Sequence, residues 1–204
     1  SGDEDTRFCF ALGSTSSGKG DYSFMEALES DDPSEVGKQA EELVDGLNIF
    51  EGIFGYRSKS FIAPCYTWDP ALNPVLFENG IDWLQGTRVQ KFSIGNNGEF
   101  QRLRHWFGES NEFGQLYNVR NVHFEPVMMP NLDTVSRALA QVSIAFRMRR
   151  PAVINTHRVN YIGSIDPGNA DHGLKSLASL LRSITRKWPD ARFVTTEQLS
   201  EHLI

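Results

Sequence analysis

The sequence predicts an α/β domain with a mostly parallel sheet and flanking helices. Short apolar runs typical of strands alternate with amphipathic segments typical of helices, and Gly or Pro stands at many of the boundaries. The order strand, loop, helix, strand is that of a βαβ unit, whose strands are parallel. The chain has 204 residues, 40% of them hydrophobic and 23% charged, which is the balance of a globular protein that buries a core.

The N-terminal elements are predicted from local signals. Residues 7–12 (RFCFAL) have the pattern of a short buried strand. Asp32 as N-cap, Pro33 and Glu35 then predict a helix start, and Gly55 predicts the end of that helix. The apolar residues at helical spacing between them are Val36, Ala40, Leu43, Val44, Leu47, Phe50 and Phe54.

The predicted βαβ unit follows. Residues 59–63 form a strand, residues 65–69 (CYTWD) a loop, and a helix runs from Pro70 to Asn79-Gly80. Residues 81–84 are the next strand.

Residues 86–130 interrupt this order, because Gly, Asn and aromatic residues dominate there. We interpret them as an irregular insertion, with strands or loops, that crosses one face of the sheet. Asn97-Gly98 predicts a hairpin between residues 89–94 and 99–103.

The C-terminal part returns to regular elements. Asn131 is predicted to cap a helix, residues 151–156 (PAVINT) to form a strand, and residues 171–188 to form a long helix. A last strand at 192–194 precedes a short helix with a Thr-x-x-Gln capping box at 195–198. The residues expected to face the core are Leu132, Val135, Leu139, Val142 and Phe146 in the first helix, and Leu174, Leu177, Leu180, Leu181 and Ile184 in the second.

Charge and composition exclude some classes of protein. A net charge of -6 argues against nucleic-acid binding, which needs a basic face, and no apolar run is long enough to span a membrane. Residues 1–5 lack the pattern of a signal peptide, although a processed chain would have the same start. Cys9 and Cys65 lie in apolar runs and are expected to be small buried residues, with a single bridge as the alternative. This cysteine usage favours the cytoplasm.

The glycine-rich segment 13–20 (GSTSSGKG) nearly matches a phosphate-binding loop. It has Gly20 where the motif needs a metal-binding hydroxyl, and no helix begins at once. We therefore interpret it as a flexible loop after a strand, from which Ser14, Ser16 and Lys19 could contact a substrate.

Two further segments place polar residues directly after predicted strands. In the loop 65–69, Tyr66 and Trp68 suit stacking on a sugar ring, and Asp69 suits its hydroxyls, although a buried Trp68 and a helix-capping Asp69 are the simpler interpretation. In NTHRVNY, His157 follows an apolar strand within a polar cluster, and its ordinary pKa suits a general acid or base.

Other polar residues could complete a site around His157. They are Arg158 and Asn160 beside it, Asp166 and Asn169 in the next loop, and His123 and Glu125 in the segment RNVHFEP. The remaining histidines are weaker candidates, and no H-x-x-x-H pair is present to hold zinc from one helix.

The segments FIAPCYTWDP, PAVINTHRVNY and RFVTTEQL together resemble the later motifs of the polysaccharide deacetylases (the NodB-type family), over about residues 35–204. The resemblance implies a distorted (β/α) barrel, or part of one, and removal of acetyl groups from sugars. It also implies a divalent metal such as zinc, with His157 as general acid for the leaving group, and Pro64 and Tyr66 in the third motif.

The chain lacks the Asp-Asp and H-x-x-x-H motifs of the family's N-terminal half, and Ile62 or Ala63 replaces the arginine of the third motif. We thus expect residues 1–204 to form one domain that either lacks the N-terminal strands of the family or represents a divergent branch.

Three functions are compatible with these residues. The leading prediction is a carbohydrate-active hydrolase of the deacetylase type, with His157 and Asp69 as catalytic residues. The second is a glycosidase that uses carboxylates such as Asp69, Glu125 or Asp166. The third is a non-catalytic sugar-binding domain, with Tyr66, Trp68 and Trp106 as stacking residues.

Overall fold

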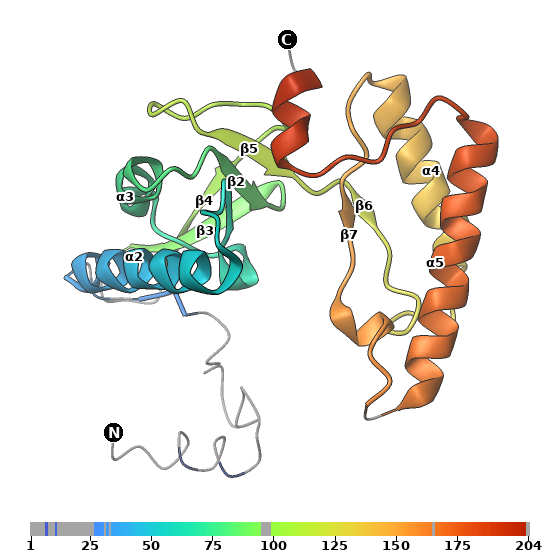
Figure 1. Cartoon of the computed structure of the whole chain (residues 1–204), viewed down its shortest axis with the longest axis horizontal. Coiled ribbons are helices and arrows are strands. Elements are labelled where there is room, and N and C mark those ends of the chain that lie inside the picture. Colours follow the sequence, from blue (N-terminus) through green and yellow to red (C-terminus); the bar gives the residue numbers. More distant parts are fainter. Residues whose placement is uncertain are drawn as a thin grey trace. The chain divides into compact units, whose positions relative to one another are not determined.

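The computed structural model describes Arg7, Ala11, residues 27–30, Asp32 and residues 34–94, 99–164 and 166–202. These residues form a mixed α/β architecture, as the sequence predicts (Figure 1). They divide into two compact units. Unit 1 holds the described residues up to His105 together with Ser110–Gln115, and unit 2 holds Trp106–Glu109 and the residues from Leu116 onward.

The predicted N-terminal strand at 7–12 is described only at Arg7 and Ala11, and both of these residues have helical backbone. The rest of that strand, Cys9 and the glycine-rich segment 13–20 lie outside the described residues.

Unit 1 begins with the long helix α2 (Glu35–Phe54). The Asp32 carboxylate accepts a hydrogen bond from the Ser34 backbone N–H at 2.8 Å, while Ser34 itself occupies the N-cap position. The predicted helix start is therefore right to within two residues. Gly55 ends the helix as predicted, with φ of 74° and its N–H donating to the Glu51 carbonyl at 2.8 Å.

The predicted βαβ unit is confirmed. Strands β1 (Ser60–Ile62) and β2 (Trp83–Gly86) pair in parallel, and a 3₁₀ turn (Pro70–Leu72) with helix α3 (Asn73–Glu78) connects them. The second strand starts two residues later than predicted. Ile81 lies in the turn that follows the helix, where its N–H donates to the Leu76 carbonyl at 3.0 Å.

The predicted hairpin is also confirmed. Strands β3 (Val89–Ile94) and β4 (Glu99–Arg104) pair antiparallel, from Val89 opposite Arg104 to Ile94 opposite Glu99. The turn residues 95–98 lie outside the described residues.

Unit 2 contains β5 (Leu116–Val119), β6 (Val122–His123), α4 (Thr134–Arg147), β7 (Ile154–Asn155) and α5 (Pro167–Lys187). Strands β6 and β7 pair in parallel, and α4 and α5 pack side by side against them (Figure 1). The buried core between these layers consists of Val122, Phe124, Ala138, Val142, Leu180 and Ile184. Two short 3₁₀ helices, Arg158–Asn160 and Glu197–His202, complete the unit.

Residues 86–130, predicted to be an insertion with strands or loops, supply the β3–β4 hairpin of unit 1 and the strands β5 and β6 of unit 2. Some details of the sequence prediction for unit 2 are wrong. Helix α4 is capped by Asp133 rather than Asn131. Hydrogen bonds from the Ser136 hydroxyl and backbone N–H lower the pKa of this carboxyl.

The faces of α4 and α5 that are predicted to point into the core do so, except at the first predicted residue of each. Leu132 precedes helix α4 and is 45% exposed, and Leu174 in the first turns of α5 is 52% exposed. Residues 192–194 are not a strand. In the described part of the chain they enter no strand ladder, and Phe193 and Val194 stay exposed. The capping box that follows is confirmed, since the Thr195 N–H donates to the Gln198 side chain at 2.9 Å.

Candidate functional site

The parallel register of β6 and β7 brings two polar residues together at the carboxyl ends of these strands. Val122 pairs with Ile154 and His123 with Asn155, and the Phe124 N–H continues the ladder to the Asn155 carbonyl at 2.9 Å. Glu125 and His157 each follow the last paired residue of their strand by two positions. They therefore lie opposite each other just beyond the sheet.

Glu125 and His157 form a hydrogen-bonded dyad. The His157 Nδ1 lies 2.7 Å from the Glu125 Oε1, and the His157 backbone N–H donates to the Glu125 Oε2 at 3.3 Å. The carboxylate is buried, with its side chain 7% exposed, whereas the imidazole is 57% exposed. Because a carboxylate only accepts, this bond places a proton on Nδ1 and leaves Nε2 as the nitrogen that can exchange a proton with a substrate.

Asn160 supports both members of the dyad. Its side chain is completely buried, and its Nδ2 donates to the Glu125 Oε2 at 2.7 Å and to the His157 carbonyl at 2.8 Å. Its Oδ1 accepts from the Val127 N–H at 3.0 Å. The Asn160 amide thus holds the Glu125 carboxylate together with the backbone of His157 and Val127. This favours a single orientation of the imidazole.

Tyr161 adds a hydroxyl next to the dyad. Its oxygen lies 2.8 Å from the Thr156 hydroxyl. Burial raises the pKa of Tyr161, the hydrogen bond with Thr156 opposes this shift, and the nearby Glu125 charge adds to it. The phenol therefore stays neutral at physiological pH and keeps its proton for a hydrogen bond.

Helix α5 approaches this cluster closely at Gly173. A Cβ added to Gly173 would lie 1.6 Å from the Asn160 carbonyl oxygen, which is far inside any permitted contact. Glycine is therefore needed at this position so that the helix can support the 3₁₀ turn that carries Asn160.

The structure brings together only part of the predicted site in unit 2. His157, Glu125 and Asn160 are in direct contact. His123 is exposed in β6 and Arg158 is exposed in the 3₁₀ turn. Asp166 is the N-cap of α5, where its carboxylate accepts from the Gly168 N–H at 2.9 Å.

The predicted residues of the loop 65–69 belong to unit 1. Asp69 caps the 3₁₀ turn Pro70–Leu72 by accepting from the Ala71 N–H at 2.8 Å, which is the simpler of the two roles predicted for it. Tyr66 is half-buried, with φ of 59°. Cys65 beside it is exposed, so the expectation of a buried thiol is wrong.

Of the two interpretations of Trp68, the simpler one, a buried side chain, is right, and the stacking role is wrong. Its side chain is 2% exposed, and its indole N–H donates to the Asn73 side chain at 3.2 Å. Its backbone is joined to β3 on both sides, through the Lys91 carbonyl and the Gln90 side chain. Trp68 thus fixes the hairpin to the core of unit 1 and cannot stack on a sugar.

Two features of the site do not follow from the sequence patterns. Tyr161 is not among the predicted site residues, although it lies four residues after His157 on the same short turn. Glu125 is predicted as a substrate-binding residue, but the structure makes it the partner of His157. Both residues stand two positions after the last paired residue of their strand, a relation that depends on the strand register and not on a local sequence pattern.

The described residues do not fit the metal that the resemblance implies. Within residues 34–94, 99–164 and 166–202, no three His, Cys, Asp or Glu side chains gather closely enough to hold an ion.

Comparison of the chain with known proteins finds no relative. No protein-family model matches the chain, and no similar protein was found among curated proteins or solved structures. No helix in the described part of the chain is long and apolar enough to cross a membrane.

Proposed function

We propose that this protein is a hydrolase of the deacetylase type, in which His157 acts as general acid and base on an acetylated carbohydrate. The observation that supports the chemistry is the 2.7 Å bond between His157 and the buried Glu125, with the imidazole half exposed. The acetylated sugar and the (β/α) barrel, or part of one, come into the proposal from the resemblance in the motifs.

In the proposed reaction, the His157 Nε2 takes a proton from a water molecule that attacks the acetyl carbonyl. It then returns this proton to the sugar oxygen or nitrogen that leaves, and acetate is released. The imidazole carries a positive charge between the two transfers, and Glu125 stabilises this charge from the side of Nδ1. Glu125 acts through His157 and is therefore a positioning residue.

The glycosidase alternative has less support. Of the three carboxylates that it would use, Asp69 and Asp166 each cap a helix through a backbone N–H. The third, Glu125, is buried against His157 and Asn160. A sugar-binding domain also has less support, because the burial of Trp68 removes one of its three stacking residues.

Acetate release from acetylated oligosaccharides tests the proposal. We expect release by the wild type and a loss of about 10² to 10⁴ in kcat for His157→Ala, which is the range for one general acid or base. Glu125→Gln should lower kcat by about 10-fold to 100-fold with KM little changed, since it removes the charge that orients and stabilises the imidazole.

The matched control is His172→Ala, because His172 is an exposed histidine of the same unit. It should retain wild-type kcat. Full activity in His157→Ala would contradict the assigned role, and new reducing ends without free acetate would identify a glycosidase instead.

A further inference from the structure

A pocket lies in unit 2, away from the His157 dyad. It has a volume of about 640 Å³ and is lined by Pro151, Ala152, Val153 and Ile154, at the amino end of β7. The dyad lies beyond the carboxyl end of the same strand, and neither Glu125 nor His157 lines the pocket. The two features are therefore separate sites.

The wall of this pocket is largely apolar. Side chains of α4, α5 and the C-terminal segment form it, among them Phe146, Ile184, Phe193, Val194 and Leu199. Its volume is within the range of small-molecule sites, which are mostly apolar with a few placed polar groups.

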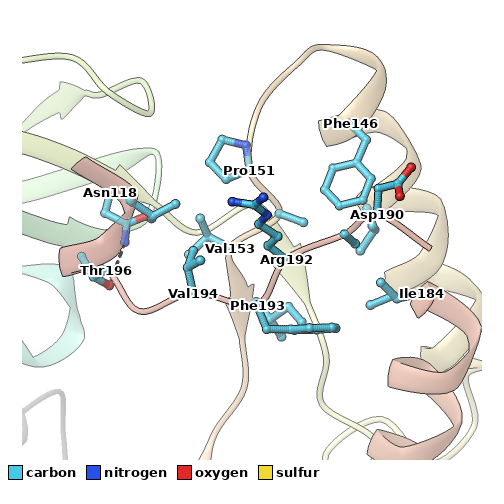
Figure 2. A pocket seen from close by; sticks show the side chains of 15 residues that line it. Asn118, Phe146, Pro151, Val153, Ile184, Asp190, Arg192, Phe193, Val194 and Thr196 are labelled. Carbon is cyan, nitrogen blue, oxygen red and sulfur yellow. Dashed lines mark hydrogen bonds between the residues drawn. The ribbon is translucent and has the colours of Figure 1, made fainter. Parts of the chain in front are cut away.

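One buried side-chain oxygen in the wall has no hydrogen-bond partner among the described residues. Asn118 is 1% exposed, and its Nδ2 donates to the Thr196 hydroxyl at 3.2 Å, but its buried Oδ1 accepts no hydrogen bond from the described residues. Figure 2 shows Asn118 and Thr196 at one end of the pocket, and Asp190, Phe146 and Ile184 at the other. A buried acceptor without a donor is costly, and a ligand that supplies the donor removes this cost.

The charged residues of the pocket do not select for an ion. Asp190 and Arg192 both line it and carry opposite charges. The wall therefore presents no net charge to a ligand, and its largely apolar surface favours a neutral one.

We propose that this pocket binds a neutral, largely apolar small molecule that carries a hydroxyl or N–H group at one end. Its apolar body packs against the wall formed by α4, β7 and α5, and its polar group donates a hydrogen bond to the Asn118 Oδ1. This inference is independent of the proposed hydrolase activity.

Two probes that differ in a single donor test the inference. 4-Hydroxybiphenyl has an apolar body with a hydroxyl donor, and 4-methoxybiphenyl has the same rings without a donor. Equilibrium dialysis with the wild-type chain should give a Kd about tenfold lower for the hydroxyl compound, which is the value of one net hydrogen bond. Asn118→Leu should bind both probes with equal affinity.

Two further variants complete the test. Val194→Trp fills the pocket and should abolish binding of both probes, while Asn131→Leu, a change at an exposed asparagine of the same unit, should behave as the wild type. The inference is overturned if the wild type binds neither probe or both equally, if the preference survives in Asn118→Leu, or if Val194→Trp binds normally. Should Asn118→Leu fail to fold, the wild type and Val194→Trp still decide the outcome.

Discussion

Asn160 links more groups of the candidate site by hydrogen bonds than any other described residue. Its amide touches the Glu125 carboxylate, the His157 carbonyl and the Val127 N–H, and it has no contact with solvent. Its removal leaves a buried carboxylate oxygen and a backbone N–H without these partners. Such losses are expensive because water cannot replace the missing groups.

We therefore expect Asn160→Ala to lower the free energy of unfolding by about 3 kcal/mol. This is the upper end of the range for the loss of a buried hydrogen bond to a charged group. Denaturant unfolding followed by circular dichroism measures this change. Asn131→Ala, at an exposed asparagine, should change stability by less than about 0.5 kcal/mol. A similar small effect for both variants would mean that the Asn160 amide does not hold the site together.

At the scale of elements, the close packing of helix α5 against the 3₁₀ turn Arg158–Asn160 depends on one glycine. An added Cβ at Gly173 would overlap the Asn160 carbonyl, so the helix or the turn must move. Overpacking of this kind costs about 3 kcal/mol when neither side can yield.

Gly173→Ala should thus lower the free energy of unfolding by about 3 kcal/mol and also reduce acetate release, since the displaced turn carries the dyad. Gly46→Ala is the control, because Gly46 lies within α2 and a Cβ added there would meet no atom within 4 Å. It should raise stability by up to about 1 kcal/mol through its helix propensity. Unchanged melting of Gly173→Ala would show that the turn can move away from the helix freely.

The elements also show how far the sequence can predict this structure. Helix α2, the βαβ unit and the β3–β4 hairpin are predictable because local signals define them: Gly55 at the helix end, Pro70 at a helix start, and Asn97-Gly98 between two strands. The prediction is wrong at 192–194, where apolar residues line a pocket instead of pairing in a sheet.

The candidate site is predictable in part for the same reason. The position of His157 just after a strand can be predicted from the residues that precede it in the sequence. Its partnership with Glu125 depends on the register of two strands separated by a helix and loops, and no local pattern encodes that register. The core role of Trp68 is likewise set by its contacts with Asn73 and Gln90.

At the scale of the whole molecule, the described residues divide into two compact units. Leu180 is fully buried in the core of unit 2, and Leu76 is fully buried in unit 1. Hydrogen exchange can therefore report on each unit by itself.

We expect Leu180→Ala to cost about 3 kcal/mol and to speed amide exchange in α4, α5 and β6 more than in α2. Leu76→Ala should produce the opposite distribution, with faster exchange in α2 and α3. Mass spectrometry of exchanged peptides measures both. Equal acceleration across the chain in either variant would mean that the two units open as one.

The equal spacing of Glu125 and His157 from their strand ends has a consequence for how this chain tolerates length changes. The register of β6 and β7 holds the two side chains together. Residues inserted or deleted in the exposed part of the connection would therefore change the number of residues between Glu125 and His157 without separating the two side chains. One residue added between Asn155 and His157 would instead rotate the imidazole to the other face. Homologues with a longer or shorter connection are therefore best aligned by the two strand ends, and a sequence search anchored on a fixed separation of the two residues would overlook them.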